Sequence, residues 1–147
     1  MIESLNALFA KHLETLNKEI AAYEDEEALW LVDKNIINSS GNLCLHICGN
    51  LQHFIGAVLG ESGYIRDRPA EFGDKNIPKK ELLSQVEKTK STVANALNKL
   101  DPETLDYEYP LAVFDKPMSK AYFLLHLLSH LTYHLGQINY HRRLLDA

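Results

Sequence analysis

Residues 2–23 read IESLNALFAKHLETLNKEIAAY, and the spacing of their apolar side chains decides the fold class. Large apolar residues recur at steps of three and four positions, at Ile2, Leu5, Phe9, Leu13, Leu16, Ile20 and Tyr23. This spacing places them along one side of an α-helix, whereas a half-buried strand would alternate apolar and polar residues. The stretch therefore predicts an amphipathic helix of about six turns.

Three further segments have helical patterns. A second helix is expected from the hydroxyls at 39–40, which can cap its N-terminus, to about Gly60. A third is expected over residues 79–100, and a fourth from Ser119, a candidate N-cap, to about Leu145. The third carries an apolar stripe at Leu82, Leu83, Val86, Val93, Leu97 and Leu100.

Four long helices in a chain of 147 residues predict an all-α four-helix bundle that forms one domain over residues 1–147. The connection at residues 60–80 is rich in Gly, Pro and charge. It is long enough to cross the bundle, so the second and third helices need not be antiparallel neighbours. The second helix is apolar over most of its circumference, which predicts that it is central or covered by another subunit. We therefore expect a homodimer.

Composition excludes several classes of protein. The net charge is −5 and basic residues are scattered among acids, which argues against a nucleic-acid partner. Apolar runs are interrupted before the roughly 20 residues that a bilayer requires, and the N-terminus does not resemble a secretory signal. Cys44 and Cys48 form neither a redox pair nor a disulfide framework, so we expect a reducing, cytoplasmic location.

The C-terminal stretch SHLTYHLGQINYHRR, residues 129–143, is rich in histidine. At 100° per residue one helix face carries His126, His130, Tyr133 at its edge, His134, Gln137 and His141. Residues four apart can reach one ion, but the stripe is about 23 Å long, so one ion cannot bind all four histidines. Helical phase leaves three choices: His126 with His130, His130 with His134, or no metal at all.

The second helix carries a matching face. His46, Asn50 and His53 lie together on it, whereas Cys44 and Cys48 point to the opposite side, which excludes a mixed Cys/His zinc site. Histidines on a helix face are often core residues with a single hydrogen bond. However, burying several imidazoles on two helices without partners is costly, and a shared metal would satisfy them together.

Other chemistry has weaker support in the sequence. The chain contains no nucleophile elbow, no phosphate-binding glycine loop, no H-E-x-x-H motif and no Glu-x-x-His pair for a di-iron site. The two remaining histidines have ordinary interpretations, with His12 expected at the surface or its boundary and His141 near a frayed helix end.

Three segments carry a family resemblance: NSSGNLCLHICGNLQHFI at 38–55, RDRPAEF at 66–72 and HLTYHLGQI at 130–138. They resemble the DinB/YfiT-like superfamily of metalloenzymes, and most closely its DUF1572-type branch. The resemblance implies a four-helix bundle, frequent dimers and a three-histidine metal site at His46, His130 and His134. Phe54 departs from the pattern, because relatives often carry Trp there.

Three imidazoles leave open positions on a zinc, nickel or iron(II) ion, which can activate a thiol or water as a nucleophile. Together with the resemblance, this predicts a metal-dependent thiol transferase or hydrolase that acts on a small-molecule thiol or electrophile. The alternative is a stress-response protein that binds a metal or small ligand without catalysis. Residues expected in the pocket or around the ligands are Asn50, His53, His126, Tyr133 and Gln137.

Overall fold

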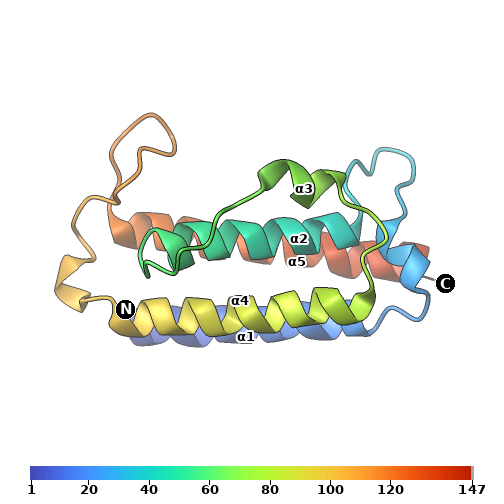
Figure 1. Ribbon diagram of the computed structural model, residues 1–147, viewed down its shortest axis with the longest axis horizontal. Helices are drawn as coiled ribbons and strands as arrows, with labels where there is room; N and C mark the ends of the chain where they lie inside the picture. Colours follow the sequence, from blue (N-terminus) through green and yellow to red (C-terminus); the bar gives the residue numbers. More distant parts are fainter. Residues whose placement is uncertain (147) are drawn as a thin grey trace.

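The computed structural model describes residues 1–146, which form five α-helices and three short helical segments of other types (Figure 1). The α-helices are α1 (Ile2–Ala21), α2 (Ser40–Leu51), α3 (Arg68–Gly73), α4 (Lys79–Lys99) and α5 (Lys120–Leu145). Two 3₁₀ turns span Glu26–Trp30 and Pro102–Thr104, and a π-helix spans Gln52–Ala57. Within residues 1–146 there is no β-strand, and no helix combines the length and apolar character needed to cross a bilayer.

The helix boundaries follow local capping chemistry. The side chain of Ser39 accepts a hydrogen bond from the backbone N–H of Asn42 at the start of α2, and Ser119 does the same for Tyr122 in α5. Hydroxyl caps of this kind satisfy backbone donors that the first helical turn leaves unpaired. Both caps confirm the predicted helix starts.

The four long helices lie side by side, with α1 and α5 running in one direction and α2 and α4 in the other (Figure 1). Helix α1 packs on α4 and α5, and α2 packs on the same two helices. The connection after α2 runs back along that helix and carries α3, so α4 starts at the same end as α2. A connection of this length allows two consecutive long helices to be parallel.

Helix α2 is central within a single chain. All its residues, 40–51, are buried. Helices α4 and α5 contact it, and α3 packs against it as well. Of the two explanations for its apolar circumference, central placement is the one observed, and the helix needs no second subunit to cover it.

The predicted single helix over residues 40–60 is wrong in one respect, because its second half is a π-helix at Gln52–Ala57. The N–H of Val58 donates to the carbonyl of His53, five residues earlier, at 3.0 Å. The Tyr109 hydroxyl donates to the carbonyl of Phe54 at 2.6 Å. This partner lies 55 residues away along the chain, so the local pattern could not reveal the contact.

The core confirms the predicted apolar stripes. In α1, the stripe from Leu5 to Ile20 is buried, and Tyr23 is buried just beyond the end of the helix. In α4, the buried positions are Leu82, Val86, Thr89, Val93, Ala96 and Leu97, with Leu83 and Leu100 at the margin. Thr89 fits this stripe because its hydroxyl donates to the carbonyl of Gln85, one turn back.

Candidate metal centre

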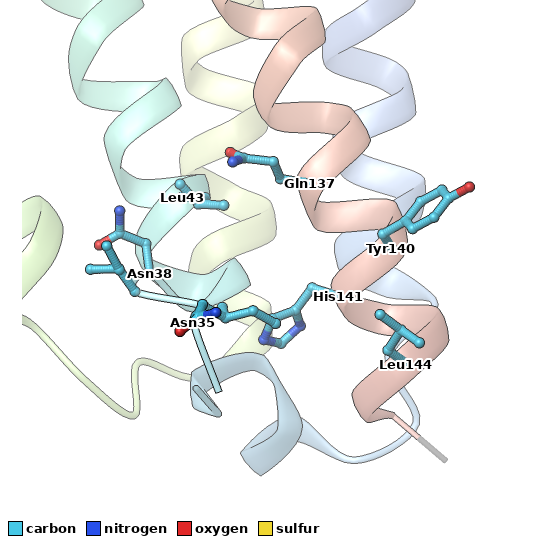
Figure 2. Close-up of a pocket in the computed structure, with 9 residues that line it drawn as sticks. Asn35, Asn38, Leu43, Gln137, Tyr140, His141 and Leu144 are labelled. Carbon is cyan, nitrogen blue, oxygen red and sulfur yellow. The ribbon is translucent and has the colours of Figure 1, made fainter. Parts of the chain in front are cut away.

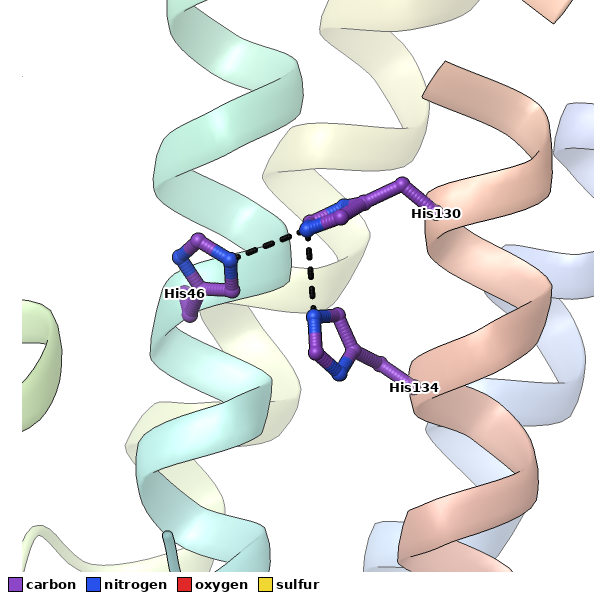
Figure 3. A group of neighbouring side chains, drawn as sticks. All are labelled: His46, His130 and His134. Carbon is purple, nitrogen blue, oxygen red and sulfur yellow. Dashed lines mark hydrogen bonds between the residues drawn. The ribbon is translucent and has the colours of Figure 1, made fainter. Parts of the chain in front are cut away.

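Three imidazoles from two helices converge at one point (Figure 3). Nε2 of His130 lies 3.1 Å from Nε2 of His46 and 3.1 Å from Nε2 of His134. The potential ligand atoms of the three residues all lie within 4.8 Å of one another. Nitrogen ligands of a tetrahedral zinc ion are about 3.3 Å apart when each lies about 2.05 Å from the metal. The two short distances are therefore close to those of a metal site.

The helices bring these side chains together. His130 and His134 are one turn apart on α5, so their side chains lie on the same face. His46 comes from α2, which packs directly on α5. His46 is buried, whereas the other two are partly exposed. The cluster thus lies where α2 and α5 meet, with two ligands on its more open side.

Hydrogen bonds fix two of the three imidazole tautomers. Nδ1 of His46 lies 3.0 Å from Oε1 of Glu71, and Nδ1 of His134 lies 2.6 Å from Oε1 of Gln137. Each oxygen accepts, so each Nδ1 carries the proton and each Nε2 keeps a lone pair. Metal-binding histidines are commonly held in this way by a second residue.

Without a cation, the two close contacts of His130 Nε2 cannot both be favourable. A proton on its Nε2 can point to His46 or to His134 but not to both. The other close contact would then join two lone pairs. A cation among the three nitrogens removes this repulsion and uses all three lone pairs, so the donor set fits a metal ion.

The protonation state of the imidazoles favours metal binding as well. Burial, reinforced by the proximity of the His134 and His46 imidazoles, lowers the pKa of His130 to about 3. Burial also lowers the pKa of His134, although its contact with Gln137 acts in the opposite direction. Both imidazoles are therefore neutral at pH 7, and neutral imidazole is the form that binds metals.

Glu71 in α3 links the histidine cluster to the segment that joins α2 to α4. Its Oε2 accepts from Nε of Arg66 at 2.9 Å, and its Oε1 accepts from Nη2 of the same guanidinium at 2.9 Å. Burial alone would raise the pKa of Glu71, but the hydrogen bonds from His46 and Arg66 outweigh it and the pKa is lowered. Glu71 is therefore an ionised carboxylate that is 5% exposed.

Gly49 makes room for this carboxylate. A Cβ atom on Gly49 would overlap the carboxyl group of Glu71. The sequence pattern alone did not indicate Glu71, Arg66 or Gly49 as site residues. The one signal was the RDRPAEF segment, which carries Arg66 and Glu71 and served only as part of the family resemblance.

The five other predicted site residues differ in how they lie relative to the histidine cluster. Gln137 holds His134, as expected for a residue around the ligands. Tyr133 is exposed, with its ring edge against His134. His126 stacks on Phe123, with its ring centroid 6.5 Å from that of His130.

Asn50 and His53 occupy the π-helix side of the cluster. Asn50 is 7% exposed, and its Oδ1 is buried without a hydrogen-bond partner in residues 1–146. An acceptor in this state is costly unless a water or ligand supplies a proton. His53 packs edge-on against Phe54 and is not part of the cluster, because two helical turns place it about 10 Å from His46 along the axis.

His141 was predicted near a frayed end, and this prediction is wrong. The residue is 4% exposed. Its Nε2 lies 2.8 Å from the carbonyl oxygen of Leu31, and its Nδ1 lies 2.6 Å from the hydroxyl of Tyr23, which also contacts Ser40 at 2.7 Å. The carbonyl can only accept, so Nε2–H donates to it and Nδ1 accepts from Tyr23. His141 therefore fastens the end of α5 to the segments around α1 and α2.

The remaining candidates lie as the sequence predicts. His12, in the middle of α1, is half-buried, at the boundary between core and surface. Cys44 and Cys48 are buried and do not belong to the histidine cluster. Their exclusion from the site agrees with their predicted position on the opposite side of α2.

Comparison with known proteins places the chain in one family. No curated protein and no solved structure matches it. A family model described as "Protein of unknown function (DUF1572)" matches residues 1–147, which is the whole sequence. The chain therefore belongs to the DUF1572 family.

Proposed function

We propose that this protein is a metal-dependent enzyme whose ion is bound by His46, His130 and His134. The observation that carries the proposal is the convergence of three Nε2 atoms, with two 3.1 Å separations, at one point. The fixed tautomers of His46 and His134 support it, because both residues direct lone pairs to that point. The metal is a divalent transition ion: zinc, nickel or iron.

We also propose that the fold is the four-helix bundle of the DinB/YfiT-like superfamily. The four long helices lie side by side, and the second and last of them supply the histidines. The resemblance of residues 38–55 and 130–138 to that superfamily supports the same assignment. A homodimer in the cytoplasm completes the proposal. The dimer rests on the family resemblance alone, because α2 is covered within a single chain, and light scattering on the purified protein tests it.

The chemistry we propose is thiol transfer or hydrolysis. A bound ion of this kind lowers the pKa of a thiol or water at an open position and so supplies a nucleophile at neutral pH. Glu71 and Gln137 hold the Nδ1 protons of their histidines, which keeps the ligand lone pairs directed inward. Asn50 offers a buried acceptor, one turn beyond His46, for a proton on the substrate or nucleophile.

Metal analysis of protein purified without a histidine tag tests the site. We expect about one equivalent of metal after loading with zinc, nickel or iron(II), and its loss in the His130→Ala variant. His12→Ala is the matched control, because His12 lies on α1 outside the cluster and should leave metal content unchanged. Less than about a tenth of an equivalent in the wild type after loading would contradict the proposal.

Activity assays separate the enzyme from a binder. The zinc-, nickel- and iron-loaded proteins are each supplied with a panel of low-molecular-weight thiols and electrophiles, and with ester and amide substrates. We expect turnover that disappears in His130→Ala. Full metal occupancy without turnover over the whole panel would favour a non-catalytic metal-binding protein instead.

A further inference from the structure

A pocket of about 370 Å³ lies between α5 and the segment that leads into α2 (Figure 2). Its apolar lining includes Ile36, Ile37, Leu43 and Leu144, and its polar lining includes the amides of Asn38 and Gln137. This volume falls within the roughly 300–1,000 Å³ that is typical of small-molecule sites.

The pocket begins about one helical turn from the histidine cluster along α2 and α5, and none of the three histidines lines it. Leu43 lies three residues before His46 on α2, and Gln137 lies three residues after His134 on α5. Three residues correspond to about 4.5 Å along a helix axis. Figure 2 shows Gln137 reaching from α5 towards Leu43. Because Oε1 of Gln137 also contacts His134, this residue belongs to both the cluster and the pocket.

The lining of this pocket carries no Asp, Glu, Lys or Arg. Three other pockets of the described chain differ in this respect. One includes Glu87 and Lys90, another Glu26 and Glu27, and the third Glu71 with several more acids. A charged ligand entering the pocket beside the histidines would lose hydration without gaining an opposite charge. The lining therefore favours a neutral ligand.

We infer that this pocket binds an uncharged small molecule with an apolar body and a carbonyl-type acceptor, as the substrate of the metal site. The inference rests on the proposed function and adds a substrate class to it. The apolar body lies against Leu43 and Leu144, and the amide nitrogen of Gln137 donates to the acceptor because Oε1 is engaged with His134. A thiol that carries carboxylates finds no cation in this lining, so the pocket receives the uncharged reactant.

Three probes of similar size and different charge test the inference on the zinc-loaded protein. They are hexanamide, pentane-1-sulfonate and hexylammonium, each titrated while backbone amide resonances are followed by NMR. We expect hexanamide to shift resonances of residues 35–38, 43 and 137–144, and to bind at least tenfold more tightly than either ion. Equal or tighter binding of an ion, or shifts confined to other regions, would overturn the assignment.

A pair of variants on α5 supplies the control. Leu144→Asp puts a charge into the pocket at a side chain that is 67% exposed. Leu125→Asp puts the same charge at an exposed position of α5 that does not line the pocket. We expect hexanamide affinity to fall at least fivefold in the first and to stay unchanged in the second. Equal effects of the two changes would overturn the assignment.

Two further outcomes separate this inference from related ones. Zinc content is measured on the same samples. Hexanamide binding here in a protein that binds no zinc would show a pocket for neutral ligands, but it would overturn the role of that pocket as the substrate site of a metal. If hexanamide does not bind and Leu144→Asp instead dissociates a dimer, the pocket is an interface between copies of the chain and the inference is wrong.

Discussion

Oε1 of Glu71 lies 3.0 Å from Nδ1 of His46, although the two residues are 25 positions apart and belong to different helices. The same carboxylate binds the guanidinium of Arg66 through both oxygens. Through this contact, the connection between the two parallel long helices takes part in the candidate metal centre. Several consequences can be measured.

Replacing Glu71 by Gln should weaken metal binding. The amide is a weaker acceptor for the Nδ1 proton of His46, and the charge that pairs with Arg66 is lost. Changes to residues that hold metal-binding histidines typically reduce affinity about 10- to 100-fold. Competition with a chelator of known affinity measures the change. Glu14→Gln, which removes only a surface pair with Lys90, should keep wild-type affinity. Equal affinities for all three proteins would show that Glu71 does not support the site.

Gly49→Ala should displace the same carboxylate. The new methyl group overlaps the Glu71 carboxyl group, which Arg66 and His46 hold in place. Overpacking of this kind costs about 1–3 kcal/mol of stability, and we expect metal affinity to fall as well. Denaturant unfolding and chelator competition measure the two effects.

Gly136→Ala is the matched control on α5, between His134 and Gln137. Beyond the adjoining turns of α5 itself, a Cβ atom there meets no atom of residues 1–146 within 4 Å. Alanine should stabilise the helix by roughly 0.5–1 kcal/mol relative to glycine and leave metal affinity unchanged. A loss of stability in this variant as large as in Gly49→Ala would contradict the steric explanation.

Tyr23→Phe should destabilise the fold without affecting the metal site. The change removes the hydroxyl between His141 and Ser40, both of which are buried. Leaving buried polar groups unpaired costs about 1–3 kcal/mol. Denaturant unfolding should detect this loss while zinc content stays near one equivalent. Tyr122→Phe, at an exposed tyrosine, should stay within about 0.5 kcal/mol of the wild type.

Removing the metal should lower stability in a concentration-dependent way. A ligand that binds only the folded state at 100 times its dissociation constant raises the free energy of unfolding by about 2.7 kcal/mol. We therefore expect a chelator to lower the unfolding midpoint of the zinc-loaded protein. His134→Ala should show a much smaller difference between zinc and chelator, whereas His12→Ala should keep the wild-type difference. An unfolding midpoint that is the same with zinc and with chelator would contradict binding of zinc to the native state.

Regular helical spacing made much of this fold predictable. The buried stripe of α1 and the caps at Ser39 and Ser119 depend on neighbours in sequence, so local rules identify them. Tyr109 contacts the π-helix and α3 packs against α2, and both contacts join residues that are distant in the chain. Local sequence patterns cannot predict such long-range contacts.

The candidate site divides in the same way. His130 and His134 share a face of one helix, so spacing made them a candidate pair, but it could not choose between that pair and His126 with His130. The family resemblance made the choice and added His46. Glu71 and the burial of His141 escaped prediction, because each depends on a partner at least 25 residues away.

The two halves of the histidine cluster also differ in when they can form. His130 and His134 are adjacent as soon as α5 is helical, whereas His46 is 84 residues from His130 and arrives only when α2 docks. A partly folded chain with α5 alone would offer an ion two ligands and weak, exchangeable binding. Addition of the third imidazole, held by Glu71, would make this weak binding tight. Tightness of metal binding would then report how completely α2 has docked on α5.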